Sequence, residues 1–394
     1  MIKRITIENF KSIKKIEIEV PRFAIMVGNN GAGKTNIFKA IKLTALLASG
    51  NQIQYCLDRL QLLPKELLFD QTNNKMKFTF ELILNERPIK YSFEITQEII
   101  ENKYIYRISQ EFLSNGNQDQ PILQRTGDRI DIYPQQGEGS VVELANTQLA
   151  VSLLRKPDMI ALVQQFLSNI LVDHLDPLSL REFGSLSKVG SESEKNLAEN
   201  LYSLINNNQN KYKEIESEAK NMISGLDSIN IGKTDQEGRL VVVFKESDFP
   251  YDLTFFSASD GNLRTLGILS SILGDPKPNV VFIDEIENSM HPTRIKSIVK
   301  LLDYLSEREK SSIQTLLTSH SPVVLNYVND QNIMYVYKKN GETKIATKPI
   351  NNKKVLQYLE MYEKEGYTLG DLFDQGILEK IFTSQNEDLH ASGN

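Results

Sequence analysis

The sequence predicts an α/β fold built on a parallel sheet, with a glycine-rich loop after its first buried strand. The apolar run FAIMV at 23–27 is followed by the glycine-rich stretch GNNGAGKT at 28–35 and then by a helical pattern. A second apolar run at 280–283 ends in two carboxylates, and a third at 313–317 precedes TSHS. Short runs without polar alternation are typical of strands buried on both faces, as in parallel sheets.

Antiparallel strands are predicted around this core. Residues 2–20 alternate between apolar and polar side chains, and MKFTFELIL, YSFEI and YIYRIS between 75 and 108 indicate a meander that turns at 86–88. The Gly-, Asn- and Gln-rich stretch 113–140 predicts a loop.

The middle of the chain predicts helices. Residues 145–230 have a helical pattern that Pro157 and Pro177 divide into pieces. From 197 to 229 apolar residues recur every three or four positions, which as one helix would span roughly 45 Å. The sequence offers no equally long return helix, so we expect a packed helical subdomain instead of a coiled-coil arm.

Alternating helices and strands return after a strand candidate at 239–245. Helices are predicted after Gly261 and after Pro292, and a hairpin is predicted with Asn340-Gly341 at its turn. The last helices are predicted from about 354 to 382.

Composition excludes several classes of protein. Lys and Arg number 45 and Asp and Glu 51 among 394 residues, so the net charge is −6 and the chain is not polybasic. The single cysteine, Cys56, excludes a disulfide framework and a Cys-rich metal site, and it fits a reducing cytosol. No apolar run is long enough for a membrane span, and the first residues do not form a signal peptide. We therefore expect a cytoplasmic protein.

The strongest motif is the stretch 28–35, which matches G-x-x-x-x-G-K-[ST] between a strand and a helix. The backbone N–H groups of such a loop surround a phosphate at a helix N-terminus. Lys34 is expected to reach the β- and γ-phosphates, and Thr35 to offer its hydroxyl to Mg²⁺. The alternative, a chance glycine-rich turn, does not explain the flanking strand and helix. The predicted nucleotide contacts are Asn29, Asn30, Gly31, Ala32, Gly33, Lys34 and Thr35.

Polar residues also follow the other two buried strands. Because the carboxyl ends of parallel strands meet where ligands bind, Asp284 is expected to hold Mg²⁺ and Glu285 to orient or deprotonate the attacking water. His320 can donate a hydrogen bond to a γ-phosphate oxygen. Taken singly, these residues also fit an exposed acidic strand end and a surface histidine; the P-loop favours the functional interpretation.

A fourth signal is SASDGNLR at 257–264, which leads into an apolar helix. Ser259 is the predicted N-cap, and a helix N-terminus with Ser259, Asp260 and Gly261 is a candidate anion site. An ordinary capped core helix is the alternative.

Together these motifs resemble the ABC-type ATPase heads of the SMC, RecF and OLD group, over about residues 1–110 and 240–345. IENFKSI at 7–13 is similar to the opening of many such heads, and the group often has Asn where Asn36 follows Thr35. The stretch DEIENSMHP at 284–292 resembles the OLD-like branch.

The resemblance implies ATP as the nucleotide, with Asn36 at its site. Ser259, Asp260 and Gly261 become the ABC signature and His320 the switch histidine. Two heads would pair head to tail around two ATP molecules, each P-loop facing the partner's signature helix. Asp260 replaces the glycine of transporter-type signatures, so its carboxylate is expected to point away from the phosphate or to cap the helix.

Four segments follow from this assignment. They are 1–112, the N-terminal half of the head; 113–238, a loop plus helical insertion; 239–350, the C-terminal half of the head; and 351–394, C-terminal helices and a polar tail.

The expected function is an Mg-ATP-dependent ATPase that controls a separately encoded effector such as a nuclease, in bacterial antiviral defence or a toxin-like system. No nuclease domain of its own is expected, because Asp371 and Asp374 lie in an apolar context typical of a docking helix. The alternative is a RecF-like ATPase that binds DNA, which the net charge of −6 disfavours. A transporter ATPase is a distant third.

Overall fold

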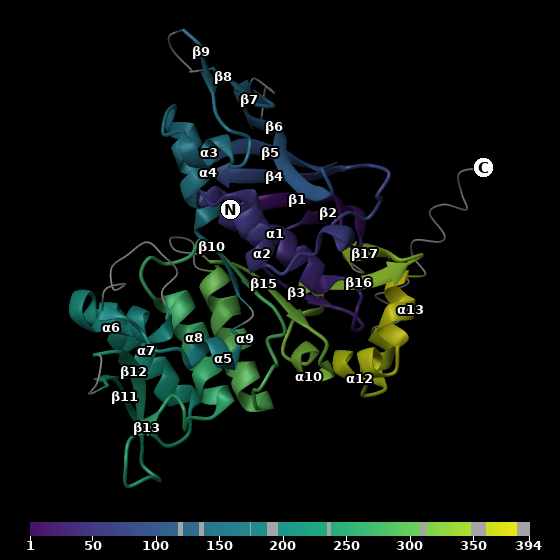
Figure 1. Ribbon diagram of the computed structural model, residues 1–394. Helices are drawn as coiled ribbons and strands as arrows, with labels where there is room; N and C mark the ends of the chain where they lie inside the picture. Colours follow the sequence, from purple (N-terminus) through teal and green to yellow (C-terminus); the bar gives the residue numbers. More distant parts are fainter. Residues whose placement is uncertain are drawn as a thin grey trace. The chain divides into compact units, whose positions relative to one another are not determined.

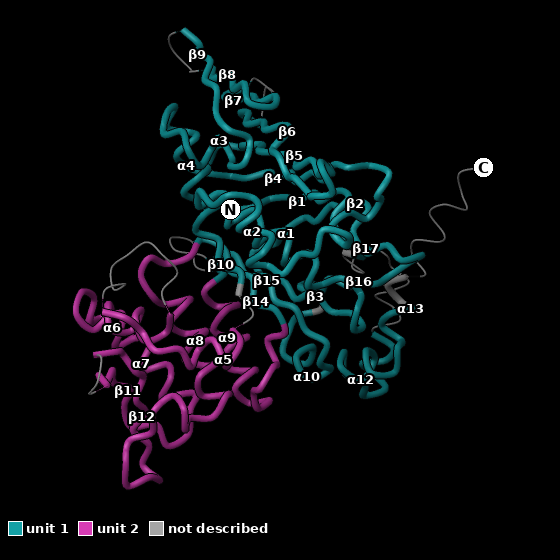
Figure 2. The backbone as a smooth tube through the Cα atoms, in the orientation of Figure 1, with its two compact units in different colours: residues 1–172, 279–284, 306–394 teal, residues 173–278, 285–305 magenta. Residues whose placement is uncertain are grey.

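Two compact units make up the chain. In the computed structural model, unit 1 comprises residues 1–172, 279–284 and 306–394, and unit 2 comprises residues 173–278 and 285–305 (Figure 2). Segment 113–238 of the predicted division contributes to both units, and the four-segment division stays a prediction. The structure describes residues 1–116, 121–133, 138–173, 175–186, 196–234, 238–307, 313–347 and 360–383.

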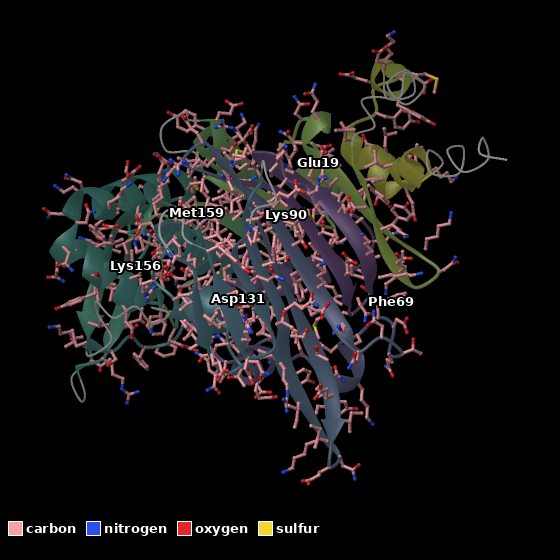
Figure 3. The ribbon with its side chains drawn as sticks, turned by 90° about the horizontal axis from the view of Figure 1, so that it is seen from above. Glu19, Phe69, Lys90, Asp131, Lys156 and Met159 are labelled. Atoms are coloured by element: carbon pink, nitrogen blue, oxygen red, sulfur yellow. The ribbon has the colours of Figure 1, made fainter. Side chains whose placement is uncertain are left out.

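An eight-stranded sheet forms the N-terminal part of unit 1. Neighbouring strands are antiparallel throughout, in the order β2-β1-β4-β5-β6-β7-β8-β9. In Figure 3, Lys90 marks β5 and Asp131 marks β8. The strands are β1 (Ile2–Phe10), β2 (Ile13–Glu19), β4 (Lys75–Leu84), β5 (Arg87–Ile100), β6 (Lys103–Asn115), β7 (Pro121–Thr126), β8 (Arg129–Ile132) and β9 (Ser140–Glu143).

This sheet confirms the predicted meander and corrects two details. The turn between β4 and β5 is Asn85-Glu86, both with positive φ, so Arg87 and Pro88 already belong to β5. The loop predicted over 113–140 was wrong, because β7, β8 and the first residue of β9 lie there. These strands have only four to six residues each, and the Gly-, Gln- and Asp-rich connections between them hide their alternation.

Aromatic and aliphatic side chains fill the space between this sheet and its covering helices. Phe78 stacks on Phe93 with ring centroids 5.0 Å apart, and Phe10 meets Phe78 edge-on at 5.6 Å. Met159, labelled in Figure 3, packs against this core from α4. The helices are α1 (Lys34–Ala48), α2 (Ile53–Arg59), α3 (Ala150–Leu153) and α4 (Asp158–Ser168), with the 3₁₀ turn η1 (Pro64–Glu66) between α2 and β4.

A buried ionic network joins this sheet to α3. The Glu111 carboxylate accepts hydrogen bonds from the backbone N–H groups of Ala150 (2.6 Å) and Val151 (3.0 Å) and from the Tyr91 hydroxyl (2.9 Å). Arg125 lies 3.8 Å from the same carboxylate, and both side chains are fully buried. The network fixes the start of α3 on the sheet.

Replacing Glu111 with glutamine is expected to lower the free energy of unfolding by about 3–5 kcal/mol, because the buried Arg125 loses its counter-charge. Urea unfolding measures the change. The control is Glu98→Gln, whose exposed pair with Arg107 is expected to contribute less than about 1 kcal/mol. Equal stability of the two variants would contradict the importance of the network.

The second sheet of unit 1 contains the predicted parallel core. Its order is β10-β14-β15-β3-β16-β17; β14, β15, β3 and β16 are parallel neighbours, and β17 is antiparallel to β16. The β16–β17 turn is Asn340-Gly341, both with positive φ, as predicted. The strands are β10 (Ile170–Asp173), β14 (Val280–Ile283), β15 (Gln314–Ser319), β3 (Phe23–Val27), β16 (Ile333–Lys339) and β17 (Glu342–Thr347).

Short helices complete unit 1 after β15. The helices α12 and α13, yellow in Figure 1, come from the C-terminal part of the chain, and α13 contacts β16. Their bounds are α10 (Pro322–Leu325), η3 (Asp330–Asn332), α12 (Leu369–Asp374) and α13 (Ile377–Thr383).

Unit 2 combines helices with the three-stranded antiparallel sheet β11-β12-β13. Its elements are α5 (Pro177–Leu180), α6 (Leu197–Asn207), α7 (Gln209–Met222), β11 (Leu226–Lys233), β12 (Leu240–Glu246), β13 (Leu253–Thr254), α8 (Asp260–Leu273) and α9 (Pro292–Glu307), whose last two residues belong to unit 1.

The apolar spacing noted over 197–229 does not belong to one continuous helix. Asn208 lies outside helical geometry (φ −149°, ψ 68°), and its side chain accepts from the backbone N–H of Lys211 as the N-cap of α7. After Gly225 (φ 77°), residues 226–233 form strand β11. The apolar residues of 197–229 therefore keep a helical spacing although they belong to two helices and a strand.

None of the described helices is long and apolar enough to cross a membrane.

Candidate nucleotide-binding site

The glycine-rich stretch forms a closed turn between β3 and α1. Gly28 (φ 154°) and Gly33 (φ 109°) have positive φ, and a Cβ at either would collide with the hairpin, at the carbonyl of Val336 and the hydroxyl of Thr343 respectively. Gly33 is also the N-cap of α1 and brings no side chain to its first turn. The start of α1 thus has the geometry of an anion site.

Lys34 lies within this turn. Its ammonium donates to the carbonyls of Gly28 (2.6 Å) and Asn29 (3.2 Å), and the residue is 7% exposed. The predicted contacts Asn29, Asn30, Gly31 and Thr35 are exposed, whereas Ala32 is buried beneath them. The outer face of the loop therefore presents polar groups, with the lysine held behind it.

A network of hydroxyl and amide groups joins the P-loop to Ser12 and to Thr343 of β17. Asn36 donates to the Ser12 hydroxyl (2.7 Å), Ser12 pairs with the Thr343 hydroxyl (2.7 Å), and Thr343 donates to the carbonyl of Ala32 (3.0 Å). The Asn36–Ser12 hydrogen bond joins the IENFKSI stretch to the first turn of α1. The side chain of Asn36 is engaged with Ser12, so its predicted nucleotide contact stays a prediction. Sequence reasoning missed Thr343.

The register of the parallel strands brings Asp284, His320 and the P-loop to one edge of the sheet. Ile283 pairs with Leu317, and Ser319 pairs with Val27. Asp284, His320 and the P-loop therefore follow the carboxyl ends of neighbouring strands, as predicted. The Thr318 hydroxyl donates to the Asp284 carboxylate at 2.5 Å, and Asp284 is 6% exposed.

The residues at this edge fit Mg²⁺ bound together with a nucleotide. Among the described residues, no group of three or more His, Cys, Asp and Glu side chains could hold a metal ion. Mg²⁺ at a phosphate site takes only one or two protein ligands and completes its shell with phosphate oxygens and water. Asp284, which accepts from Thr318, and the exposed Thr35 both offer oxygen atoms of this kind, and their binding of Mg²⁺ stays a prediction.

Unit 2 carries the predicted signature. Ser259 is the N-cap of α8 and accepts from the backbone N–H of Asn262 at 3.1 Å, as predicted. The Asp260 carboxylate forms an ion pair with Arg181 at 2.7 Å, and Arg181 also donates to the carbonyl of Ala258 at 2.9 Å. Arg181, which sequence reasoning missed, offsets the negative charge that Asp260 places in the signature.

Glu285 begins the turn after β14 in the left-handed conformation (φ 49°). Its carbonyl accepts from the backbone N–H of Asn288 at 3.0 Å, and its carboxylate accepts from the side-chain amide of Asn288 at 2.8 Å. Asn288 thus orients the carboxylate that is predicted to act on water.

The C-terminal helix α13 contacts the P-loop directly. The Asn29 amide donates to the Glu379 carboxylate at 3.0 Å, across 350 residues of sequence. Burial, followed by the nearby Glu379, raises the pKa of the Tyr335 hydroxyl, also on the α13 side of β16. No local signal in the sequence points to this contact.

Asp371 has a structural task. It forms a capping box at the start of α12 with Thr368, whose hydroxyl and backbone N–H both donate to its carboxylate. These hydrogen bonds lower the pKa of Asp371. Its carboxylate is thus engaged in capping the helix.

Fold and P-loop define the class: the chain has the α/β fold of SMC heads, with a P-loop between β3 and α1. An SMC head bound to the C-winged helix domain of ScpA matches with a TM-score of 0.55 and 13% identity, covering 87% of this chain and 97% of that chain. An SMC head with an extended coiled coil, bound to the C-terminal domain of ScpA derived from Pyrococcus furiosus, matches with a TM-score of 0.53 and 13% identity, covering 92% and 99%. At this identity the similarity establishes the fold.

The chain belongs to the family described as "AAA domain, putative AbiEii toxin, Type IV TA system", whose model matches residues 23–139 and 157–326. No curated protein matches the sequence. The predicted fold of an SMC-like head is confirmed, whereas the ATPase activity and the OLD-like branch stay predictions.

Proposed function

We propose that this protein is an ATPase that binds Mg-ATP at the P-loop and hydrolyses it in a dimer of heads. The observation that supports it most strongly is the convergence of the P-loop, Asp284 and His320 at one edge of the parallel sheet. Lys34 would contact the β- and γ-phosphates, Asp284 and Thr35 would hold Mg²⁺, and His320 would donate to the γ-phosphate. Glu285 would orient the attacking water.

The second half of each site would come from another copy of the chain. Ser259 and Asp260 are exposed at the N-terminus of the 14-residue helix α8, where a phosphate oxygen can approach. Arg181 supports this role, because it compensates the Asp260 carboxylate that would otherwise repel a phosphate.

We further propose that the ATP cycle controls a separately encoded effector, such as a nuclease, in antiviral defence or a toxin-like system. The family description names a Type IV TA system, which supports the toxin-like setting. The hydrogen bond between Asn29 and Glu379 supports a way for the nucleotide to control a partner through α13. A nucleotide at the P-loop would contact Asn29, which already donates to Glu379 of α13. We place the protein in the cytoplasm, because its single cysteine, Cys56, is free and buried, which fits a reducing compartment.

A RecF-like ATPase that binds DNA is the alternative, because it shares this class of fold. A DNA-binding measurement at two salt concentrations separates the two roles. Affinity that falls steeply with salt would favour the alternative.

Composite sites predict complementation between two inactive variants. Ser259→Arg is expected to block the signature, and Lys34→Ala to impair the P-loop. A mixture should recover activity, because one site of the heterodimer then pairs an intact P-loop with an intact signature while the other carries both lesions. Steady-state ATP hydrolysis measures the recovery, with each variant alone as the control.

Absence of recovery in heterodimers proven by differential tagging would overturn the composite site. ATPase activity of the wild-type chain without dimerisation would point to sites complete within one chain.

A further inference from the structure

A fully buried arginine lies on the signature helix, beside the turn that carries Glu285. Arg264 is the fifth residue after the N-cap Ser259, and it is 0% exposed. A buried guanidinium is costly unless its donors are satisfied. In unit 2, its Nη2 donates to the carbonyl of Glu285 at 2.6 Å, and its Nη1 lies 3.5 Å from the carbonyl of Leu175.

The same turn is held at two further points. The backbone and side-chain amides of Asn288 donate to the carbonyl and carboxylate of Glu285. A Cβ added at Gly261 would lie 2.7 Å from the carbonyl oxygen of Ser289, so the start of α8 and the end of this turn are in close contact. The left-handed backbone of Glu285 is a conformation that a glutamate rarely adopts without support.

We propose that Arg264 is a positioning residue for Glu285, acting with Asn288. Arg264 fixes the backbone of the turn from the signature helix, and Asn288 fixes the carboxylate, so that the base is aimed before the nucleotide arrives. The inference rests on the proposed ATPase function and goes beyond it, because it assigns a signature-helix residue to the water-activating group of its own chain.

The competing interpretation is that Arg264 only stabilises α8, which would serve the nucleotide of the partner. The complementing heterodimer separates the two roles. Its active site takes the P-loop and Glu285 from the Ser259→Arg chain and the signature helix from the Lys34→Ala chain. Arg264→Lys can therefore be added to either chain.

We expect kcat of the heterodimer to fall by about 10- to 100-fold when Arg264→Lys is placed in the chain that supplies Glu285, and to stay unchanged when it is placed in the other chain. This is the scale of a lost hydrogen bond to a charged group. The KM for ATP should stay unchanged, because the phosphate contacts are intact. Asn288→Ala in the same chain should give the same split between kcat and KM. The matched control is Arg239→Lys, an exposed arginine of unit 2 that stacks on Phe183.

Three outcomes would overturn the proposal. They are a loss of kcat only when Arg264→Lys is in the chain that supplies the signature helix, an equal loss in both placements, and no loss in either. If Arg264→Lys does not fold, as judged by circular dichroism, the two placements of Arg264→Gln decide by the same criterion. An inactive heterodimer before Arg264 is altered would instead reject the composite site itself, so the two failures are distinguishable.

Discussion

Glu285→Gln is expected to lower the rate of ATP hydrolysis by about 10²–10⁴-fold, the usual scale for a positioned acid–base group. Glutamine keeps an oxygen for the hydrogen bond from Asn288, so the turn should keep its shape. ATP binding should be preserved, because the P-loop is unaltered. Steady-state hydrolysis gives the rate, and calorimetric titration of ATP with Mg²⁺ gives the affinity.

The matched control is Glu287→Gln, a half-buried glutamate two residues further along the same turn. It should hydrolyse ATP at close to the wild-type rate. Wild-type activity of Glu285→Gln would show that another group activates the water.

Lys34→Ala is expected to weaken ATP binding by about 10- to 100-fold, because a charge-assisted hydrogen bond to phosphate is lost. The ammonium also donates to the carbonyls of Gly28 and Asn29, so its removal loosens the loop as well. Titration with a non-hydrolysable ATP analogue and Mg²⁺ measures the affinity without turnover.

Lys39→Ala, on the same helix α1, is the control for a lost positive charge. It should bind the analogue like the wild type. Unchanged affinity of Lys34→Ala would remove the P-loop lysine from the nucleotide site.

The parallel core was predictable because its signals are local. An apolar run without alternation needs burial on both faces, and Gly28 and Gly33 need backbone conformations that other residues rarely adopt. The carboxyl ends of parallel strands must share an edge, so the position of Asp284 and His320 followed once the strands were assigned. The N-cap at Ser259 was equally local.

Elements with mixed or short patterns were not predictable in this way. The strands within 121–143 are so short that their alternation of apolar and polar side chains cannot be told from the pattern of a loop. The spacing of apolar residues on either side of Asn208 could not reveal that one helix ends there and another begins. A helical spacing of apolar residues can continue through a break in the helix. Here local capping outweighed periodicity.

The residue types at the site could thus be read from the order of amino acids, because phosphate binding and strand burial each impose a short, regular pattern. Their supports could not. Glu379 on Asn29, Thr343 on Ala32, Arg181 on Asp260 and Arg264 on Glu285 join residues 21 to 350 positions apart. Such pairs form only when packing brings distant segments together, and an arginine or glutamate outside a motif has the same local signature whether it is solvated or bound. Tertiary structure alone decided which of these side chains support the P-loop, the start of α8 and the turn at Glu285.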